Sequence, residues 1–451
     1  MTFSVEHKRV TVAGAARSGL AAAELLARRG ARVTLSDSRA DLPDADRLRR
    51  LGVALELGGH TVDTFTSADL VVLSPGVPPE QDVVQAARDR AIPVIAEIEL
   101  ASRWLQGRLI AITGTKGKST TTALTGRMLE AAGFKVTVGG NIGSPLSAQV
   151  SDSTPDTFHV VETSSFQLEQ IDTFHPWIAV MLNISPDHLD RHPGVEAYAA
   201  AKARIFENQN VSDFAVIKAD DPSVLELARR GRATARPFSL VGTIHRGTVI
   251  EDGWIVDRQP DRAERLVPLD VIHLLGPHLV NDVMAAATVG AIAGAAPTAM
   301  TAAVDAFRGL EHAMELVADV GGVRFVNDSK ATNVESARRS IESFDRDLVP
   351  IMGGRFKGGD LRLLREPLKA RAKALVTIGE ARPLLRAALG DVVDVVEADS
   401  LAAAIDRAYE RAKPSGVVLL APACASFDMF RDYAERGRRF KEEVQRLRDK
   451  G

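Results

Sequence analysis

A short glycine-rich loop constrains the fold of this chain more than any other feature of its sequence. Residues 113–120 read Thr-Gly-Thr-Lys-Gly-Lys-Ser-Thr, and the four residues before them are all apolar. The apolar run predicts a buried strand, and the spacing of apolar residues over 120–132 predicts a helix that Gly133 ends. A turn of this kind exposes backbone N–H groups at the positive end of the helix dipole, and this arrangement suits polyphosphate.

The side chains of the loop support the same interpretation. Lys118 adds a point charge, and Ser119 adds a hydroxyl that can bind Mg²⁺. The spacing is G-x-x-G-K-[ST]-T, which is shorter than the usual phosphate loop because Ile112 stands in the place of the first glycine. We therefore predict that residues 113–120 hold the phosphates of a nucleoside triphosphate within an α/β domain.

Composition limits the remaining choices. A chain of 451 residues predicts about three domains, and 45% hydrophobic with 25% charged residues is ordinary for a globular protein. The net charge of −3 gives no reason to expect a nucleic-acid partner. The single cysteine, Cys424, excludes an internal disulfide, fits a reducing compartment and is expected to be a small buried residue rather than a nucleophile. The sequence has no signal-peptide pattern and no apolar run long enough to span a bilayer, so we expect a cytoplasmic protein.

The first of three segments with alternating strands and helices carries half of a dinucleotide-binding fingerprint. A strand at 10–13 leads into a turn from Gly14 to Gly19, and a second strand ends at Asp37, where an acid can reach a ribose hydroxyl. Ala16 replaces the glycine that lets the backbone approach a pyrophosphate. The pattern predicts a Rossmann-like βαβ unit and leaves NAD and other ligands open.

The second and third segments continue the alternation, which predicts parallel, doubly wound sheets. In the second segment, strands are expected at 109–112, 160–161, 178–182 and 214–217, a small β-meander between 238 and 266, and two helices over 283–307. In the third, strands are expected at 323–326, 348–352, 374–378 and 417–420, and a charged amphipathic helix with a solvated outer face over 430–451.

Polar residues gather where the expected strands end, which is the edge of an open α/β sheet that binds ligands. Ser119, Glu162 and His188 leave three neighbouring strand ends of the second segment, around the expected triphosphate. A hydroxyl, a carboxylate and waters are suitable ligands for Mg²⁺, whereas imidazole is less usual, so a structural role for His188 stays open. Lys202 lies on a helix soon afterwards, and the sequence alone favours a solvated charge there.

The third segment offers hydroxyls and cations at three strand ends. The polar run 327–333, the glycine-rich run 353–359 and the run 421–430 follow the strands that end at Val326, Met352 and Leu420. Such groups suit a small anionic substrate.

Together these motifs resemble the Mur ligases, the amide-forming ligases of peptidoglycan synthesis, and within that family the branch that adds D-glutamate. The resemblance extends from Gly14 to Tyr433 and rests on six runs, which are residues 114–120, 140–143, 162–168, 187–191, 327–333 and 422–428. The phosphate loop also occurs in the related folylpolyglutamate synthetases, whereas the runs at 164–168 and 327–333 indicate the D-glutamate-adding branch.

The resemblance implies an α/β chain of three domains. Residues 1–104 would form a Rossmann-like domain that holds a UDP sugar, residues 105–308 a central P-loop-type ATPase domain with a mostly parallel sheet, and residues 309–451 a Rossmann-like domain that binds the amino acid. It implies ATP-dependent addition of D-glutamate to UDP-N-acetylmuramoyl-L-alanine through an acyl phosphate, with release of ADP and phosphate. We expect a monomer without nucleic-acid partners or membrane insertion.

The resemblance also implies roles for individual residues. Lys118, Glu162, His188 and Lys202 would be catalytic, and Ser119, Glu162 and His188 would bind Mg²⁺. Lys202 matches the lysine that is carbamylated in the family, which reverses the interpretation from the sequence alone. The residues expected to bind ATP are Gly114, Thr115, Lys116, Gly117, Lys118, Ser119, Thr120, Asn281, Asp328 and Lys330. Those expected at the UDP sugar are Ser18, Asp37, Ser38, Arg39, Ser74 and Asn141, and those at D-glutamate are Thr332, Lys357, Ser426 and Tyr433.

Four positions depart from the family pattern near the expected ATP site. Ala313 stands where an arginine is common, and Phe356 where an acidic residue is common. The motif His-Asn-x-x-Asn becomes His-Leu-Val-Asn-Asp at 278–282, so that Leu279 and Asp282 stand in place of asparagines. The alternatives are a related ligase with another acceptor, a non-catalytic protein that binds a nucleotide sugar and, as the weakest, a Rossmann dehydrogenase.

Overall fold

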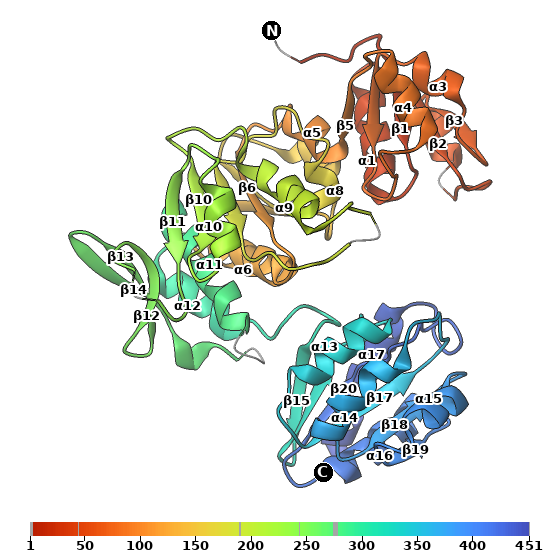
Figure 1. Cartoon of the computed structure of the whole chain (residues 1–451), viewed down its shortest axis with the longest axis vertical. Coiled ribbons are helices and arrows are strands. Elements are labelled where there is room, and N and C mark those ends of the chain that lie inside the picture. Colours follow the sequence, from red (N-terminus) through yellow and green to blue (C-terminus); the bar gives the residue numbers. More distant parts are fainter. Residues whose placement is uncertain (1–2, 44, 189–190, 243, 274–277, 451) are drawn as a thin grey trace. The chain divides into compact units, whose positions relative to one another are not determined.

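The computed structural model describes residues 3–43, 45–188, 191–242, 244–273 and 278–450 and divides the chain into two compact units. The first unit comprises Met1–Ile272 and Val280–Asp305, and the second comprises His273–Leu279 and Ala306–Gly451. Two sheets lie in the first unit and one in the second (Figure 1). None of the helices in the described ranges is long and apolar enough to cross a membrane.

The N-terminal sheet is a parallel Rossmann-like sheet with the strand order β3-β2-β1-β4-β5. This order places the carboxyl ends of β1 and β4 side by side, where connections leave toward opposite faces and a crevice forms. The strands are β1 (Arg9–Ala13), β2 (Arg32–Asp37), β3 (Ala54–Leu57), β4 (Leu70–Leu73) and β5 (Val94–Ala96). The helices are α1 (Arg17–Arg28), α2 (Ala45–Arg50), α3 (Val62–Thr66), α4 (Asp82–Asp89) and α5 (Glu97–Ser102).

The central sheet has nine strands in the order β14-β13-β12-β11-β10-β9-β6-β8-β7. It is parallel from β7 to β12, and β12, β13 and β14 form the predicted meander as an antiparallel extension. The strands are β6 (Arg108–Thr113), β7 (Lys135–Gly140), β8 (Thr157–Glu162), β9 (Ile178–Met181), β10 (Phe214–Lys218), β11 (Thr234–Phe238), β12 (Gly247–Glu251), β13 (Trp254–Gln259) and β14 (Arg262–Pro268). The helices are α6 (Lys118–Ala131), α7 (Leu146–Gln149), η1 (Val150–Asp152), α8 (Ser165–Leu168), α9 (Val195–Ala203), η2 (Arg204–Phe206), α10 (Pro222–Ala228), η3 (Leu269–Val271), α11 (His278–Ala293) and α12 (Pro297–Ala306).

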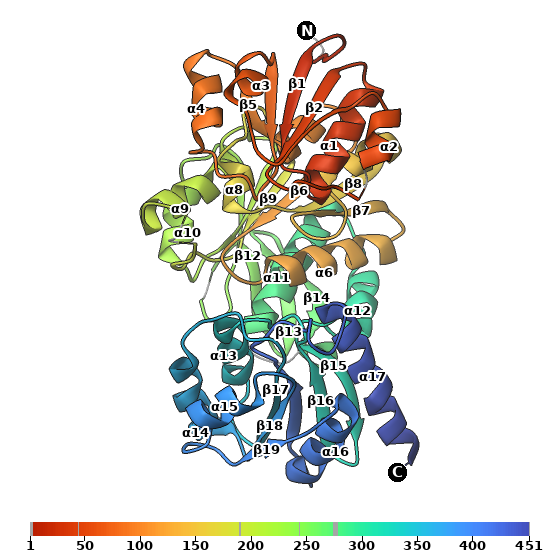
Figure 2. The same ribbon diagram turned by 90° about the vertical axis from the view of Figure 1, so that its right-hand side faces the viewer.

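The C-terminal sheet, in the second unit, has the order β15-β16-β20-β17-β18-β19, and only the pair β15–β16 is antiparallel. Helix α17 lies along one side of this sheet, near β15 and β16 (Figure 2). The strands are β15 (Glu315–Val320), β16 (Val323–Asn327), β17 (Leu348–Gly353), β18 (Leu375–Ile378), β19 (Val395–Glu397) and β20 (Val417–Leu420). The helices are α13 (Val334–Glu342), η4 (Leu361–Leu364), α14 (Arg365–Arg371), α15 (Arg382–Leu389), α16 (Leu401–Ala412) and α17 (Tyr433–Lys450).

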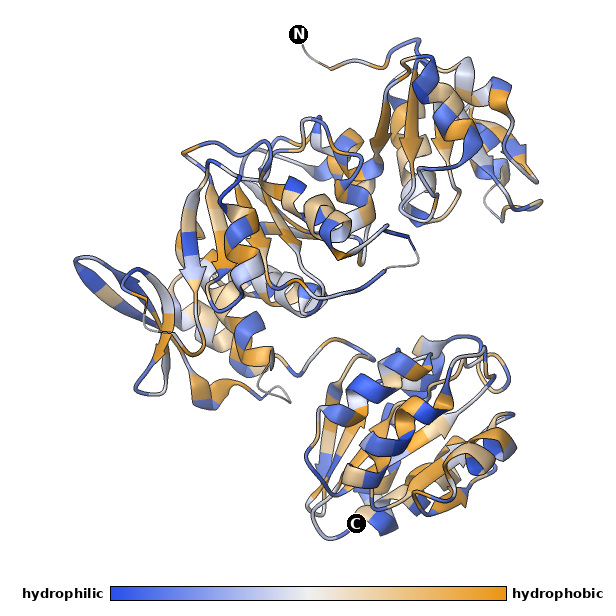
Figure 3. Cartoon of the chain, viewed as in Figure 1, coloured by the Kyte–Doolittle hydropathy of each residue, from blue (hydrophilic) through white to orange (hydrophobic). Residues whose placement is uncertain are grey.

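The central parallel strands are continuously apolar because both of their faces are buried. In β20, Val417 and Leu419 belong to one buried cluster, whereas Val418 and Leu420 belong to the cluster on the opposite face. Figure 3 shows the same contrast, with mostly hydrophobic strands and helices that carry hydrophilic stretches. This packing explains why every strand predicted from an apolar run is present.

Most differences from the predicted fold lie at the edges of the sheets. The antiparallel pairs of β13 with β12 and β14 belong to the predicted meander, whereas the antiparallel pairing of β15 with β16 was not predicted. Strands β3, β5, β7, β11, β15 and β19 were not predicted, since each is an edge strand or carries polar or proline residues within its apolar pattern. The domain boundaries at 104/105 and 308/309 stay predictions.

A buried acid at the start of α5 makes the stability of the first unit dependent on pH. Glu97 is 1% exposed, its Oε1 accepts a hydrogen bond from the Ser147 N–H at 2.6 Å, and burial raises its pKa from 4.5 to about 7. Between these values the folded protein holds a proton that the unfolded chain has released, so stability falls as pH rises through this window. The difference corresponds to about 3 kcal/mol.

We expect Glu97→Gln, which copies the protonated form, to remove this loss. Urea unfolding at about pH 5 and about pH 8 should give a variant that matches the wild type at the lower pH and exceeds it by up to about 3 kcal/mol at the higher. Glu99 on the same helix is the contrast, because its carboxylate accepts hydrogen bonds from the N–H groups of Asp172, Thr173 and Phe174. Glu99→Gln should destabilise. A wild type whose stability is the same at both pH values would contradict the role given to Glu97.

Candidate active site

The phosphate loop connects β6 to α6, as its sequence predicts. Gly117 precedes α6 with φ +83°, in the left-handed region that favours glycine. A Cβ at this position would also stand 2.2 Å from Oδ1 of Asp282, so the carboxyl of Asp282 packs directly against the loop. Asp282 is 4% exposed, and burial raises its pKa well above the usual value. The sequence analysis noted Asp282 only as a departure from the family pattern.

A chain of three side chains joins the loop to the end of the neighbouring strand β8. Glu162 is the last residue of β8 and is 2% exposed. Its Oε2 accepts a hydrogen bond from the Ser119 hydroxyl at 2.6 Å, and its Oε1 accepts one from the Asn141 amide at 2.7 Å. The predicted pair of Ser119 and Glu162 is therefore in direct contact.

Lys118 folds back over the loop. Its Nζ donates hydrogen bonds to the carbonyl oxygens of Gly114 at 3.0 Å and Thr115 at 2.9 Å, and burial lowers its pKa. The loop itself is held by Asn183, whose Oδ1 accepts a hydrogen bond from the Lys116 N–H at 2.9 Å. Thr120 lies in the first turn of α6. These hydrogen bonds hold the loop in a defined conformation between β6 and α6.

Lys202 is buried rather than solvated. It lies on α9 at 2% exposure, its Nζ donates to the Thr113 hydroxyl at 3.3 Å, and it lies 4.9 Å from the centre of the Tyr198 ring. Burial and then the nearby charge of Lys118 lower the pKa of Lys202 to about 7. The interpretation from the sequence alone, a solvated charge, was therefore wrong, because α9 packs over the loop. Burial therefore favours the neutral amine at this position.

The two histidines that follow β9 differ in environment. His188 is exposed, has φ +53°, and its ring lies 5.0 Å from that of Phe166. Neither Ser119 nor Glu162 forms a hydrogen bond with it. His192, which the sequence analysis missed, is 3% exposed and lies between the Ser165 hydroxyl at 2.9 Å and Glu169 at 3.1 Å. Two members of the predicted motif, Leu189 and Asp190, lie outside the described residues.

The oxygen groups of Ser119 and Glu162 suit Mg²⁺, which prefers hard oxygen ligands and phosphate. Within the described ranges, no group of three or more His, Cys, Asp or Glu side chains could by itself hold a metal ion. The donors therefore fit an ion that is completed by phosphate oxygens and water. Asn281 lies on α11, and its Oδ1 is buried without a partner among the described residues.

A cavity of about 450 Å³ opens at the crevice between β1 and β4. All six residues predicted to contact the UDP sugar line it, namely Ser18, Asp37, Ser38, Arg39, Ser74 and Asn141. Arg17 and His60, which the sequence did not suggest, line it as well. We call this space the sugar cavity, after the ligand that the sequence analysis expects there.

Asp37 is held as an anion within the sugar cavity. Burial opposes ionisation, but hydrogen bonds from the Arg39 side chain at 2.9 Å and from the N–H groups of Ala15 and Arg39 lower its pKa to about 2. The fixed carboxylate can accept hydrogen bonds from hydroxyl groups of a ligand. Ser74 instead donates to the carbonyl oxygen of Gly14 at 2.8 Å, which ties the ends of β4 and β1 together.

In the second unit, the three predicted polar runs lie together at the carboxyl ends of β16, β20 and β17. The N–H of Ala423 donates to the carbonyl of Ala331, and the N–H of Gly353 donates to that of Pro422, both at 2.9 Å. Arg355 and Ala425 form a short antiparallel bridge. The three strands are neighbours in the sheet, which explains why their ends meet.

The residues predicted at these strand ends differ in exposure. Lys330, Lys357 and Tyr433 are exposed, Thr332 is half-buried and Ser426 is buried. Asp328 points into its own unit, where it accepts hydrogen bonds from the Ser340 hydroxyl and from the Met314 N–H at 3.2 Å. Burial raises the pKa of Asp328 to about 6. The roles of these residues toward ATP and D-glutamate stay predictions.

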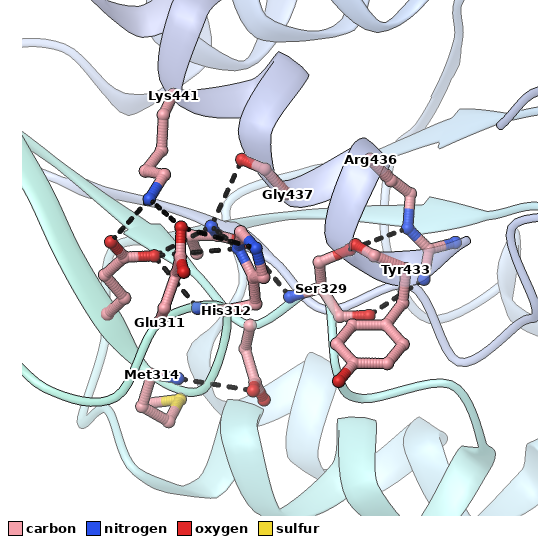
Figure 4. A network of polar contacts seen from close by, with 11 residues as sticks. Glu311, His312, Met314, Ser329, Tyr433, Arg436, Gly437 and Lys441 are labelled. Atoms are coloured by element: carbon pink, nitrogen blue, oxygen red, sulfur yellow. Dashed lines mark hydrogen bonds and ion pairs between the residues drawn. The ribbon is translucent and has the colours of Figure 1, made fainter. Parts of the chain in front are cut away.

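A buried arginine beneath these loops was missed by the sequence analysis. Arg436 lies on α17 at 1% exposure, so the expected solvated face was wrong for this residue. It donates from Nε to the Ser329 hydroxyl and from Nη2 to the Ser329 carbonyl, both at 2.9 Å (Figure 4). Its Nη1 also donates to the Cys424 carbonyl at 3.2 Å. Burial lowers its pKa only to about 10, so it stays cationic. The apolar residues Phe440 and Val444, which lie on the same face of α17 as Arg436, were the sequence signal that this face is buried.

We expect Arg436→Met to destabilise the second unit by about 2 to 4 kcal/mol, because the oxygens of Ser329 and Cys424 would be buried without donors. Urea unfolding measures the loss, and Arg448→Met on the exposed side of α17 is the matched control. Equal stability of the two variants would contradict the role given to Arg436. Cys424 is buried beside it with a pKa raised to about 12, which agrees with the predicted packing role.

The other half of Figure 4 is a network at the start of the second unit. Lys441 donates to Glu311 at 2.8 Å and to Glu315 at 3.0 Å. Asn327 donates from Nδ2 to Nδ1 of His312 and to Glu315, both at 3.0 Å. His312 and Met314, on either side of Ala313, both have positive φ. The network holds the backbone in a defined conformation around Ala313, one of the positions that differ from the family pattern.

Three domains of known families match the chain. The Mur ligase MurD-like N-terminal domain matches residues 8–96, the Mur ligase middle domain residues 112–290, and the glutamate ligase domain of Mur ligases residues 312–424. UDP-N-acetylmuramoylalanine--D-glutamate ligases from Koribacter versatilis and Acidobacterium capsulatum are 44% and 46% identical over 448 and 447 residues. These alignments cover 99% and 98% of this chain and 99% and 97% of the relatives.

Solved structures share the fold at low identity. The UDP-N-acetylmuramate-alanine ligase of Thermotoga maritima has a TM-score of 0.56 at 19% identity, covering 98% of this chain and 100% of the other. The MurF ligase of the same organism has a TM-score of 0.56 at 16% identity, covering 98% and 96%.

The protein has three β-sheets packed against helices, a phosphate loop and a cavity at the Rossmann-like crevice. These features define a nucleotide-binding protein of the multidomain α/β class. With family domains matched along most of its length, the chain belongs to the Mur ligase family. It is therefore an ATP-dependent enzyme that forms amide bonds.

Proposed function

We propose that the protein joins D-glutamate to UDP-N-acetylmuramoyl-L-alanine, with ATP converted to ADP and phosphate, as a step in making the peptidoglycan precursor. The observation that carries the proposal is the pair of hydrogen bonds that link Asn141 to Glu162 and Glu162 to Ser119. Asn141 lines the sugar cavity, and Ser119 belongs to the phosphate loop, so a nucleotide sugar and a triphosphate can meet across Glu162. The names of the full-length relatives supply the substrates of the proposal.

The proposed chemistry begins with a carboxylate, which is a poor acyl donor. An oxygen of the L-alanyl carboxylate attacks the γ-phosphorus of ATP, ADP leaves, and an acyl phosphate forms. The amine of D-glutamate then attacks the acyl carbon, the C–O bond to phosphate breaks, and the nitrogen loses a proton as the amide forms. Positioning and charge stabilisation are the main contributions of protein side chains to such a transfer.

Different groups of residues would bind the phosphates, the metal ion and the two substrates. Lys118 and the N–H groups at the start of α6 would offset charge on the phosphates. Ser119 and Glu162 would hold Mg²⁺, which, when bound, stabilises the negative charge of the transferring phosphoryl group. Asp37 would accept hydrogen bonds from the hydroxyls of the nucleotide sugar. Thr332, Lys357, Ser426 and Tyr433 would bind D-glutamate in the second unit.

The same proposal includes a carbamate on Lys202. A neutral amine is the nucleophile that adds to CO₂, forming a nitrogen–carbon bond with loss of one proton, and the lowered pKa of Lys202 supplies that neutral amine. The product carries a negative charge and could support a second Mg²⁺. We further propose that the protein works as a monomer in the cytoplasm, where ATP is available.

The test is phosphate release from ATP and Mg²⁺ in the presence of UDP-N-acetylmuramoyl-L-alanine and a panel of amino acids that includes both glutamate enantiomers. Release that requires D-glutamate would support the proposal. Release with a different amino acid would keep the ligase chemistry and replace the acceptor. No release with any amino acid would favour a protein that binds nucleotide sugars without catalysis, and omission of the sugar nucleotide is the control.

A further inference from the structure

A second groove in the first unit has a positively charged lining to which the proposed reaction gives no role. It has a volume of about 510 Å³ and lies between α1 and residues 145–151. Four arginines line it, namely Arg17, Arg28 and Arg29 from α1 and its end, and Arg47 from α2. We call this space the α1 groove. Its only acidic lining residue among the described residues is Glu24.

The α1 groove has an apolar floor between cationic ends. Lining residues 17, 20, 21, 24, 25 and 28 recur at intervals of three and four, which places them on one face of α1. Arg17 and Arg28 begin and end this stripe, about 16 Å apart along the helix. Leu20, Ala21 and Leu25 lie between them. A ligand in the groove would therefore contact apolar surface along its length and guanidinium groups at its ends.

Among the described residues that line the groove, arginines outnumber acidic side chains by four to one. Glu24 approaches Arg47 at 2.5 Å and Arg28 at 3.9 Å, so a single carboxylate lies between two of the arginines. Arg17 donates to the uncharged carbonyl of Gly143 at 3.1 Å, and Arg29 lies 4.8 Å from the centre of the Trp104 ring. This local excess of positive charge occurs in a chain whose net charge is −3. It favours an anionic ligand.

We propose that the α1 groove is a second anion site, which takes an organic phosphate with an apolar body. Guanidinium groups match phosphate oxygens in pairs, so Arg28 and Arg29 would take the phosphate, and the apolar body would lie on Leu20, Ala21 and Leu25. The volume falls in the range of small-molecule sites, about 300 to 1,000 Å³. The site is independent of the function proposed above, although Arg17 and Pro145 line both the groove and the sugar cavity.

Calorimetric titration of the full chain with hexyl phosphate and with inorganic phosphate tests the proposal. Saturating UDP and ADP, whose own binding is measured first, occupy the sugar cavity and the phosphate loop. We expect one hexyl phosphate to bind, at least about tenfold more tightly than inorganic phosphate, because each buried methylene strengthens binding by up to about fourfold. The double substitution Arg28→Gln/Arg29→Gln should weaken binding at least about tenfold.

The matched control is Arg50→Gln, an exposed arginine of α2 outside the groove, which should bind hexyl phosphate as the wild type does. Equal affinity for hexyl phosphate and inorganic phosphate would refute the apolar floor. Binding that survives the double substitution, or that UDP and ADP abolish, would place the anion elsewhere and overturn the proposal. Failure of UDP or ADP to bind would count against the proposed function and not against the groove.

Discussion

Substitution of Lys202 by alanine is expected to lower turnover by about ten- to a hundredfold, the loss typical of a group that supports a metal site. The side chain is buried against Thr113 and Tyr198, and its pKa, lowered to about 7, favours the neutral amine that the proposed carbamate requires. If the carbamate supplies a negative charge at this place, bicarbonate or a short carboxylic acid should restore part of the activity of Lys202→Ala. Phosphate release with and without the added acid measures the recovery.

Two controls separate a carbamate from a merely structural lysine. Lys202→Arg keeps the positive charge and cannot form the carbamate, so it should be inactive and should not respond to the acid. The wild type should lose activity when CO₂ is removed from its buffer and regain it when CO₂ returns. Full activity of Lys202→Arg would show that a cation is sufficient, and a Lys202→Ala variant that no acid restores would count against the carbamate.

Glu162→Gln is expected to lower turnover by about a hundredfold, the size of effect found when one charge-stabilising group is removed from a site. Glutamine has the same shape: its oxygen can accept from the Asn141 amide, and its NH₂ group can donate to the Ser119 hydroxyl oxygen. The substitution therefore removes the charge with little change in packing. Turnover measured over a range of Mg²⁺ concentrations should show a raised Mg²⁺ requirement. Removal of Mg²⁺ with a chelator should abolish the activity of the wild type.

Glu130→Gln is the matched control, because Glu130 is exposed near the end of the same helix that begins at the phosphate loop. It should have the turnover and the Mg²⁺ requirement of the wild type. A Glu162→Gln variant with near wild-type turnover would refute the assignment of Glu162 as a ligand of Mg²⁺. Loss of turnover without a change in the Mg²⁺ requirement would indicate that Glu162 acts by orienting Ser119.

The sequence was sufficient for the phosphate loop and for the position of Glu162 because both depend on local patterns. An apolar run, a glycine turn and an amphipathic stretch define β6, the loop and α6. Residues at the ends of neighbouring parallel strands must lie at one edge, so Glu162 follows from the order of β6 and β8. The same reasoning placed the three polar loops of the second unit together.

Burial of charged groups could not be predicted in this way. Lys202 and Arg436 lie on helices with ordinary polar sequences, and they are buried only because distant segments pack over them. The inward position of Asp328 depends on Ser340 and Met314, which follow no local pattern. Antiparallel pairing of β15 depends on a tight turn at Gly321 and Gly322 and not on its apolar content.

The hydrogen bond from Asn141 to Glu162 has a consequence for inhibitors. A compound in the sugar cavity that takes the Asn141 amide for itself leaves one oxygen of Glu162 without its donor. The loss of this hydrogen bond would then affect the binding of both the compound and the nucleotide. The factor by which the compound alters the affinity for the nucleotide must equal the factor by which the nucleotide alters the affinity for the compound. An inhibition constant for this cavity therefore has meaning only together with the concentrations of ATP and Mg²⁺ at which it was measured.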